Sequence, residues 1–179
     1  MKKLLMILPL ALVLCIMVGC QDKATMAELE EFKAQAEVEE QNKEIARKFV
    51  EALDKRNFDI HEVLLSDDYV CHFAGNPEPL LREAQKQFIQ VYYEAFPDNT
   101  HSIEDMIAKD DKVILRQINR ATHDKEFEGL PPSGKQFEYD GIWIFRIDEG
   151  KIVESWGVED YLSFWMQLGM ELKPKEEEK

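Results

Sequence analysis

The spacing of apolar residues divides the chain into a helical first part and a strand-rich second part. Apolar residues that recur every three or four positions predict helices over 45–57, 60–65, 81–96 and 160–169. Apolar and polar residues that alternate predict strands over 69–73, 102–108, 112–123, 135–147 and 151–156. Pro97 ends the 81–96 helix, because the residue before a proline avoids the helical conformation.

The order of these elements predicts an α+β fold. The last four strands follow one another along the chain, and turn-forming residues at 110–111 and 148–150 favour tight antiparallel connections. We therefore expect a curved antiparallel sheet wrapped over the N-terminal helices. Such a sheet encloses a conical pocket whose wall consists of alternate strand residues.

The first twenty residues have the pattern of an export signal. Lys2 and Lys3 precede an uncharged run of 16 residues, 4–19, which is short for a membrane-spanning helix and typical of a signal peptide. The run ends in Met17-Val18-Gly19-Cys20, which resembles the lipobox of bacterial lipoproteins. This resemblance implies that residues 1–19 are removed and that Cys20 carries a lipid anchor to a membrane of the bacterial cell envelope. The alternative is a short anchor helix that stays in place.

A polar segment separates the signal from the folded domain. Residues 20–41 are rich in Glu, Ala, Lys and Gln and contain neither Pro nor Gly, so we expect a helical tether. The folded domain is expected over 42–172, and residues 173–179 form a charged tail. If the chain is processed at Cys20, Cys71 is the only remaining thiol, and its place in a strand indicates a buried structural residue.

Composition and charge argue against several classes of function. The 179 residues include 22 Lys and Arg against 36 Asp and Glu, which gives a net charge of −14. A nucleic-acid partner is not expected, because phosphate binding needs clustered basic residues. The four histidines lack the spacing of a metal site, and we see no glycine-rich phosphate loop, so neither a metal nor a cofactor is expected.

Several motifs, in order along the chain, resemble the SnoaL-like polyketide cyclases. The segments that carry the resemblance are 67–72, 95–98, 103–105, 122–135, 142–146 and 150–160. Together they place about residues 42–170 in the resemblance. It implies a nuclear transport factor 2-like fold, a cone with a pocket, which agrees with the curved sheet expected from the apolar pattern.

The resemblance also implies a reaction, an intramolecular aldol condensation on a polyketide ester without metal or cofactor. Asp160, just after Trp156 of the last strand, matches the position of the family's acid/base aspartate, and His72 matches a first-strand histidine that orients the substrate. A carboxylate suits this role because desolvation in a dry pocket raises its pKa. Gly157 is a departure, since many members have an acidic residue there.

Each of these candidates has a purely structural alternative. Asp160 starts a predicted helix, so its carboxylate is equally suited to cap the backbone N–H groups. His72 alternates with Val70 and could be a core histidine, although a pocket position is favoured if Cys71 and Phe73 form the opposite face. His123 ends a strand, where it is either at the pocket rim or simply exposed.

Other residues are candidates for ligand binding. Tyr139, Trp143 and Phe145 share one face of a strand, and with Trp156 they could stack on a flat aromatic ligand; otherwise they belong to the core or to a dimer face. Gln117 and Asn119 place polar amides in an apolar strand. Buried amides need hydrogen-bond partners, so a ligand, an ordered water or exposure to solvent are the options.

Two functions are compatible with these features. The first is a lipid-anchored enzyme, a cyclase, isomerase or hydrolase that uses Asp160 for acid/base chemistry. The second is a non-catalytic module that captures a small apolar or aromatic molecule outside the cytoplasm. In either case we expect a homodimer formed through the open face of the sheet, with Trp143 or Phe145 at the interface.

Overall fold

The computed structural model describes residues 2–174, and for residues 2–22 and Ala24 it describes the backbone alone. Its contacts divide the chain into two units, residues 1–38 and residues 39–179. The side chains of the lipobox residues 17–20 and the tail residues 175–179 lie outside the described part. Among the residues that are described, no helix has the length and apolar character needed to cross a membrane.

A single helix, α1, runs over Lys2–Asp54 and contributes to both units. In the first unit its apolar side chains, such as Leu29 and Phe32, are exposed. In the second unit one stripe of the helix is buried in the domain core, as the apolar spacing predicts; its members are Ala46, Phe49, Val50 and Leu53. The helical segment over 39–54 is therefore the part of α1 that builds the domain.

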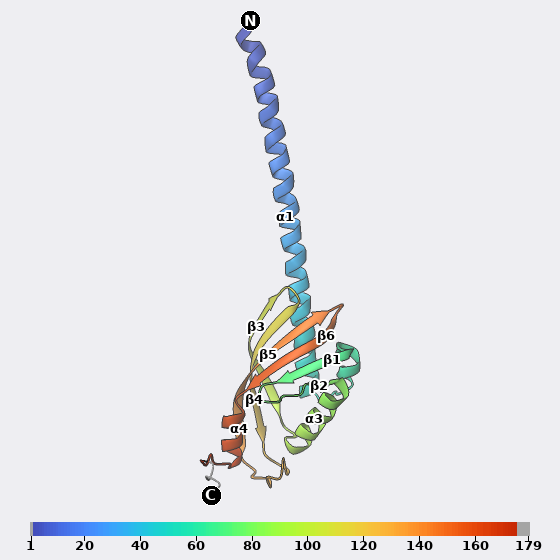
Figure 1. The fold of residues 1–179 in the computed structure, drawn as a ribbon, viewed down its shortest axis with the longest axis vertical. Coiled ribbons are helices and arrows are strands. Elements are labelled where there is room, and N and C mark those ends of the chain that lie inside the picture. The colour runs from blue at the N-terminus through green and yellow to red at the C-terminus, as the bar shows by residue number, and fades with distance from the viewer. Residues whose placement is uncertain (1, 175–179) are drawn as a thin grey trace. The chain divides into compact units, whose positions relative to one another are not determined.

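The remaining elements form one sheet with short helices around it (Figure 1). The helices are α2 (Ile60–Leu64), α3 (Arg82–Ala95) and α4 (Tyr161–Leu168). The strands are β1 (Leu65–Phe73), β2 (Leu80–Leu81), β3 (Thr100–Lys109), β4 (Lys112–Thr122), β5 (Gln136–Asp148) and β6 (Lys151–Glu159). Their order across the sheet is β2-β1-β6-β5-β4-β3.

The sheet is mixed, which corrects the expectation of a wholly antiparallel one. β3 to β6 form the expected antiparallel meander, and β2 is a short antiparallel partner of β1. β1, however, runs parallel to β6, with His72 opposite Trp156. Parallel strands need a long connection, here most of the domain, so no local turn signal announces this pairing.

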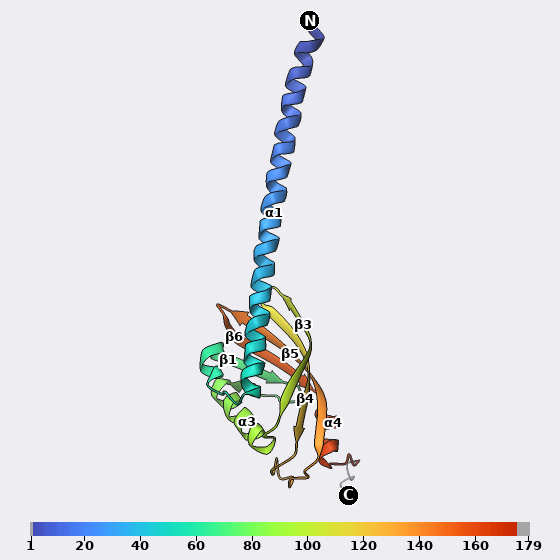
Figure 2. The ribbon, with the colours of Figure 1, turned by 180° about the vertical axis from the view of Figure 1, so that it is seen from behind.

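The sheet curves around the helices that cover one of its faces. The register shifts between Ile103 and Asp105 and again between Arg146 and Ile147, and such bulges bend a strand and increase its twist. Figure 2 shows α3 and the 39–54 part of α1 over the same face of the sheet. The space between this face and the two helices is where the core and the cavity lie.

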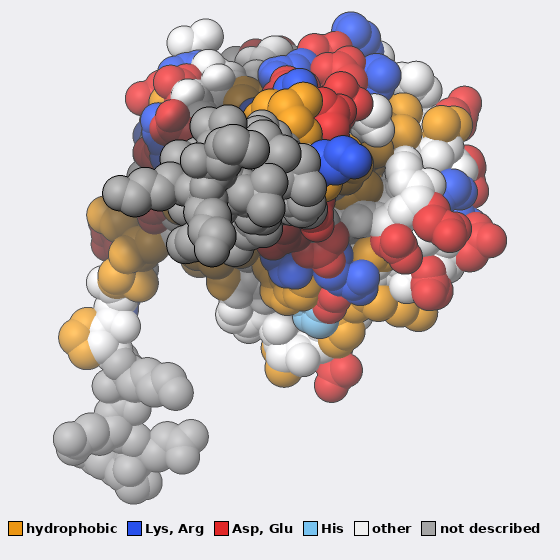
Figure 3. Space-filling model, turned by 90° about the horizontal axis from the view of Figure 1, so that it is seen from above, with side chains coloured by type: hydrophobic (Ala, Val, Ile, Leu, Met, Phe, Trp, Pro, Cys, Tyr) orange, Lys and Arg blue, Asp and Glu red, His pale blue; other side chains and the backbone are white. Residues whose placement is uncertain are grey.

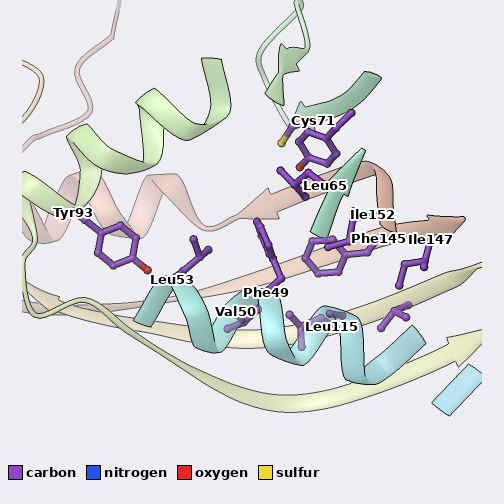
Figure 4. Close-up of a cluster of buried hydrophobic side chains, with 13 residues drawn as sticks. Phe49, Val50, Leu53, Leu65, Cys71, Tyr93, Leu115, Phe145, Ile147 and Ile152 are labelled. Atoms are coloured by element: carbon purple, nitrogen blue, oxygen red, sulfur yellow. The ribbon is translucent and has the colours of Figure 1, made fainter. Parts of the chain in front are cut away.

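The core has two parts. In the first, side chains of α1 such as Phe49 and Leu53 pack against the sheet residues Leu115 and Phe145 (Figure 4). The second is built around Phe96 and Phe164 and is closed by α4. Burial of these apolar surfaces supplies the main stabilisation of the fold.

Strand alternation assigns each side chain to one face of the sheet. Trp143 and Phe145 face the helices, so neither lies on the open face where a dimer contact was expected. The residues between and beside them face outward instead. The large exposed apolar side chains on β3 to β6 are Ile107, Ile114, Ile142 and Val158.

Candidate functional site

A cavity of about 80 Å³ lies between the concave face of the sheet and the two covering helices. Most of its wall is apolar or aromatic, with contributions from Phe49, Phe73 and Phe145. Phe88, which also lines it, is 37% exposed, so the cavity reaches the surface beside α3. Polar groups from several elements also reach the wall; they are Gln85, Asn99, His101, Gln117, Asn119, Glu159 and the hydroxyl groups of Tyr92, Tyr93, Tyr139 and Tyr161.

Glu159, the last residue of β6, is the acidic side chain in the cavity wall. Its Oε1 accepts a hydrogen bond of 3.1 Å from the indole Nε1–H of Trp143. Burial raises the pKa of the Glu159 carboxyl, because desolvation penalises the charged form. Contacts with Trp143 and Tyr161 oppose that rise without cancelling it. A carboxyl whose pKa is raised in this way holds a proton more readily than an exposed one, which suits it to proton transfer.

Two glycines shape the space around this carboxyl. A Cβ atom on Gly157 would lie 2.6 Å from Trp143 Cη2, so only glycine lets the indole ring cross the strand and reach Glu159. This explains the departure at Gly157: Trp143 occupies the place that a side chain would need. A Cβ on Gly141 would lie 3.3 Å from Glu159 Oε1 and 3.5 Å from Asn119 Nδ2, so Gly141 leaves room between these two polar groups.

A histidine–aspartate pair forms another polar part of the wall. The Nδ1 atom of His101 lies 2.6 Å from Oδ1 of Asp54, at the end of α1. Both carboxylate oxygens of Asp54 also accept the backbone N–H of His101, at 3.2 and 3.3 Å. Since a carboxylate offers only acceptors, Nδ1 carries the hydrogen in this pair. The His101 side chain is 10% exposed and lines the cavity.

Two amides in the wall are incompletely hydrogen-bonded. Gln117 Nε2 donates to Asn119 Oδ1 at 3.2 Å, and both side chains are almost fully buried. Within the described residues, Gln117 Oε1 and Asn119 Nδ2 have no hydrogen-bond partner, and the same is true of Gln85 Oε1. An unpaired buried polar atom costs about 1–3 kcal/mol, so this region is suited to a ligand or water that supplies the missing partners.

The tyrosines of the wall act as neutral hydrogen-bonding groups. The hydroxyl groups of Tyr92 and Tyr139 lie 2.9 Å apart. Burial raises the pKa of both hydroxyls far above neutrality, as it does for Tyr161. They can therefore orient a bound molecule but do not ionise in the physiological range.

Asp160 does not lie in the cavity, which corrects the expected position of the acid/base group. Its exposed carboxylate accepts the backbone N–H of Ser163 at 2.9 Å and caps the start of α4. The chain leaves the sheet at this residue, so Asp160 turns outward while Glu159, one position earlier, still follows the strand alternation and faces inward. The motif that pointed to Asp160 is thus one residue from the buried carboxyl.

His72 and Trp156 also lie outside the cavity, on the outer face of the sheet. Their rings stack at 5.6 Å with an interplanar angle of 9°, and His72 Nε2 lies 3.0 Å from Glu154 Oε1. Cys71 and Phe73 do form the face opposite His72, but that opposite face is the inner one. The expectation of a pocket position for His72 and Trp156 is therefore wrong, because alternation along β1 and β6 places both side chains on the outer face.

His123 is neither at the cavity rim nor exposed. It is fully buried, with its ring 5.6 Å from that of Phe96 and Nδ1 3.3 Å from Ser133 Oγ. Tyr139, Trp143, Gln117 and Asn119, by contrast, all lie in the cavity wall, where their role in binding stays a prediction. Among the described residues, no cluster of three or more metal-ligating side chains is present.

The sequence interpretation missed Glu159, Asp54 and His101. Strand alternation offered a signal for Glu159, which shares its parity with Gly157 and not with Trp156. Asp54 follows Val50 by one helical turn at the edge of the buried stripe. For His101 the sequence holds no clear signal, because its partner is 47 residues away and belongs to a helix.

Comparison with known proteins gives matches over the same domain. The family model of the SnoaL-like polyketide cyclases matches residues 43–168. IdmH from Streptomyces antibioticus, a proposed polyketide cyclase, is 30% identical, with a TM-score of 0.66 over 73% of this chain and 99% of that one. AclR from Streptomyces galilaeus, a proposed hydroxylase, is 25% identical, with a TM-score of 0.68 over 73% and 97%.

A third solved structure shares the fold at lower identity. It is a proposed SnoaL-like polyketide cyclase from Jannaschia sp. CCS1, 20% identical, with a TM-score of 0.69 over 75% of this chain and 95% of that one. No protein with a curated description matches the chain.

Proposed function

Because this chain belongs to the SnoaL-like polyketide cyclase family, we propose that it binds a small carbonyl compound in its cavity and that Glu159 transfers a proton on that compound. One observation carries the proposal: the acidic side chain in the cavity wall is partly buried, bonded to Trp143 and raised in pKa by desolvation. A carboxyl so placed is a suitable general acid or base.

The proton transfer follows from simple enolate chemistry. The ionised Glu159 carboxylate removes a proton from the carbon next to a carbonyl group, and the C–H electron pair moves to the carbonyl oxygen. The resulting enolate can attack a second carbonyl carbon, which is the aldol step, or take the proton back. Asn119 Nδ2, which has no partner within the described residues, is a suitable donor to a ligand oxygen near Glu159.

The size of the cavity limits what it encloses. A cavity of about 150 Å³ admits benzene, and this one is about half as large. It is suited to enclose a carbonyl group and its neighbouring carbon, while a larger ring system would extend past Phe88 to the surface. The flat polycyclic ligand suggested by the aromatic residues would thus be held only in part.

The alternative function is non-catalytic capture of a small apolar molecule. The mainly aromatic wall supports it, and solved relatives of this fold carry different proposed activities, a cyclase and a hydroxylase, so the fold alone does not decide. The raised pKa of the Glu159 carboxyl favours the acid/base function, because simple binding of an apolar molecule gives no reason to bury an ionisable group.

An exchange assay separates the two functions. Acetophenone in D₂O is a flat carbonyl probe whose methyl hydrogens exchange slowly without a catalyst, and ¹H NMR follows their loss. We expect the purified full chain to exchange them faster than buffer does, and Glu159→Gln to reduce the protein-dependent rate by about 10²- to 10⁴-fold. Absence of exchange above the buffer rate by the wild type would overturn the acid/base function.

We further propose that Cys20 carries a lipid and anchors the protein to a membrane of the bacterial cell envelope. The support is in the sequence: the basic residues Lys2 and Lys3, the uncharged run after them and the motif Met17-Val18-Gly19-Cys20. Mass spectrometry of the mature N-terminus tests this. A lipid-modified Cys20 at the N-terminus is expected; an intact Met1 or an unmodified terminus elsewhere would contradict it.

A homodimer through the outer face of the sheet is also proposed. Ile107 pairs with Ile114 across β3 and β4, and Ile142 pairs with Val158 across β5 and β6, so exposed apolar side chains lie side by side on this face. Adjacent apolar residues on an exposed sheet face suit burial by a second copy of the chain.

A further inference from the structure

The cavity wall contains a second ionisable unit that the chemistry of Glu159 leaves unused. His101 on β3 and Asp54 on α1 form a hydrogen-bonded pair, and the imidazole faces the same cavity as Glu159. We propose that His101 is a second proton-transfer residue, which gives a proton to the carbonyl oxygen while Glu159 takes one from the carbon, and that Asp54 is its positioning residue. This inference rests on the proposed function.

The geometry of the pair leaves one ring nitrogen available. Nδ1 is engaged by Asp54 at 2.6 Å, and the backbone N–H of His101 binds the same carboxylate, which fixes the ring relative to α1. The hydrogen bonds of His101 to the described residues use Nδ1 and the backbone N–H, and Nε2 takes no part in them. A histidine held through Nδ1 by a carboxylate, with a free Nε2, is the arrangement that lets an imidazole accept and donate a proton at one defined atom.

The strands bring His101 close to the proposed reaction site. His101 is directly opposite Asn119 in the β3–β4 pairing, and the space left by Gly141 lies between Asn119 and Glu159. The imidazole is also near enough to Glu159 for its charge to favour ionisation of that carboxyl. A molecule bound in this part of the cavity therefore lies against a wall that contains both the Glu159 carboxyl and the His101 imidazole.

Other groups in the cavity do not compete for this role. Besides its partner Asp54, the titratable side chains that line the same cavity as the imidazole are Glu159, Tyr92, Tyr93, Tyr139 and Tyr161. Burial raises the pKa of all four tyrosine hydroxyls, so they keep their protons over the working range. Arg56 lies beyond Tyr93, with its guanidinium over the ring at 4.2 Å and bonded to backbone carbonyls.

The proton balance of the step closes without another reagent. Glu159 gains the proton of the broken C–H bond, and protonated His101 loses its Nε2 proton to the carbonyl oxygen that becomes a hydroxyl group. Exchange with water then returns a proton to His101 and removes one from Glu159. The active state thus needs an ionised Glu159 together with a protonated His101, which predicts a bell-shaped pH profile.

The acetophenone exchange assay on the full chain tests the inference. We expect His101→Gln to reduce the rate by about 10²-fold and to remove the alkaline limb of the pH profile, because glutamine cannot supply a proton. Asp54→Asn keeps an acceptor for Nδ1–H but removes a negative charge, so the alkaline limb should move to lower pH. The matched control is His72→Gln, on the outer face of the sheet, which should leave both rate and profile unchanged.

The outcomes separate this inference from the proposed function. If Glu159→Gln is inactive while His101→Gln keeps the wild-type rate and pH profile, the role of His101 is overturned and that of Glu159 stands. If Glu159→Gln is as active as the wild type, the proposed function itself fails. Should His101→Gln not fold, ¹⁵N NMR of the wild-type imidazole decides. The neutral ring is expected to carry its hydrogen on Nδ1, and a hydrogen on Nε2 would overturn the inference.

Discussion

Glu159 and Asp160 are neighbours in the chain but have opposite surroundings. Glu159 is the last residue that follows the alternation of β6 and faces the cavity, whereas Asp160 caps α4 at the surface. Sequence alone points to this segment and includes the capping alternative for Asp160, which the structure confirms. It does not identify Glu159, because Glu159 faces the cavity only if Trp156 faces outward, and Trp156 was expected to face inward.

Parity also explains which of the other candidate residues lie in the cavity wall. Gln117 and Asn119 share one face of β4, Tyr139 and Trp143 share one face of β5, and alternation brings all four to the cavity wall. His72 was chosen with the opposite assumption and lies outside. A strand pattern fixes which residues share a face, but a strand that is apolar on both faces, such as β1, does not reveal which face is inside.

The raised pKa of Glu159 predicts a pH-dependent cost to stability. The folded state holds the proton to higher pH than the unfolded chain, so the contribution to stability is full below the ordinary value of about 4.5 and is lost as pH rises through the folded pKa. Glu159→Gln escapes this loss, and its Oε1 can still accept the Trp143 N–H.

Denaturant unfolding at several pH values measures the effect. The free energy of unfolding of Glu159→Gln should be close to that of the wild type near pH 4.5 and exceed it near pH 8, by about 1.4 kcal/mol for each unit by which the pKa is raised. A difference that does not grow with pH would mean that the carboxyl is not desolvated in the folded protein.

At the level of elements, local patterns were informative and long-range pairings were not. The C-terminal end of α1, the helices α3 and α4 and the strands β3 to β6 follow from periodicity and turn residues within a few positions of the predicted bounds, whereas the continuity of α1 from Lys2 to Asp54 was not predicted. The parallel pairing of β1 with β6 did not, because it joins distant parts of the chain. The strand β2 did not either, because two residues are too few to show an alternating pattern. The Asp54–His101 pair was not predicted for the same reason as the β1–β6 pairing, since its two residues are 47 positions apart.

The glycines at 141 and 157 show how the elements create the site. Both lie on the inner face of the sheet, where a side chain would collide with the Trp143 ring at position 157 and would crowd Glu159 at position 141. Neither has the positive φ that favours glycine in turns, so their role is to leave space. In the sequence, a glycine inside a strand indicates only a residue that stabilises the strand poorly. The neighbouring side chains, Trp143 at Gly157 and Glu159 at Gly141, show why these positions are small.

At the level of the whole molecule, the net charge is negative, but side chains of both signs are interspersed on the surface. On the face seen in Figure 3, lysine and arginine side chains lie among aspartates and glutamates. Pairs such as Arg116–Asp105 and Arg146–Glu154, at 3.0 Å each, join neighbouring strands on the outer face of the sheet. These pairs flank the exposed apolar side chains of that face.

The proposed dimer is tested by placing a charge on the outer face. We expect the purified wild type to sediment as a dimer and Ile142→Glu to sediment as a monomer, because the interface would bury an unpaired carboxylate. Val63→Glu is the matched control: Val63 is 61% exposed, but it belongs to α2 and not to the strands that carry the exposed apolar side chains, so this variant should stay dimeric. A monomeric wild type at high concentration would contradict the dimer.

The most direct test of the central claim compares two neighbouring carboxyls in the acetophenone exchange assay. Glu159→Gln and Asp160→Asn each replace one carboxyl by its amide, and Asn still caps α4, so both variants should fold. We predict that Glu159→Gln loses about 10²- to 10⁴-fold of the protein-dependent rate while Asp160→Asn keeps the wild-type rate. The reverse result, with Asp160→Asn inactive and Glu159→Gln active, would contradict the assignment of Glu159 as the proton-transfer group.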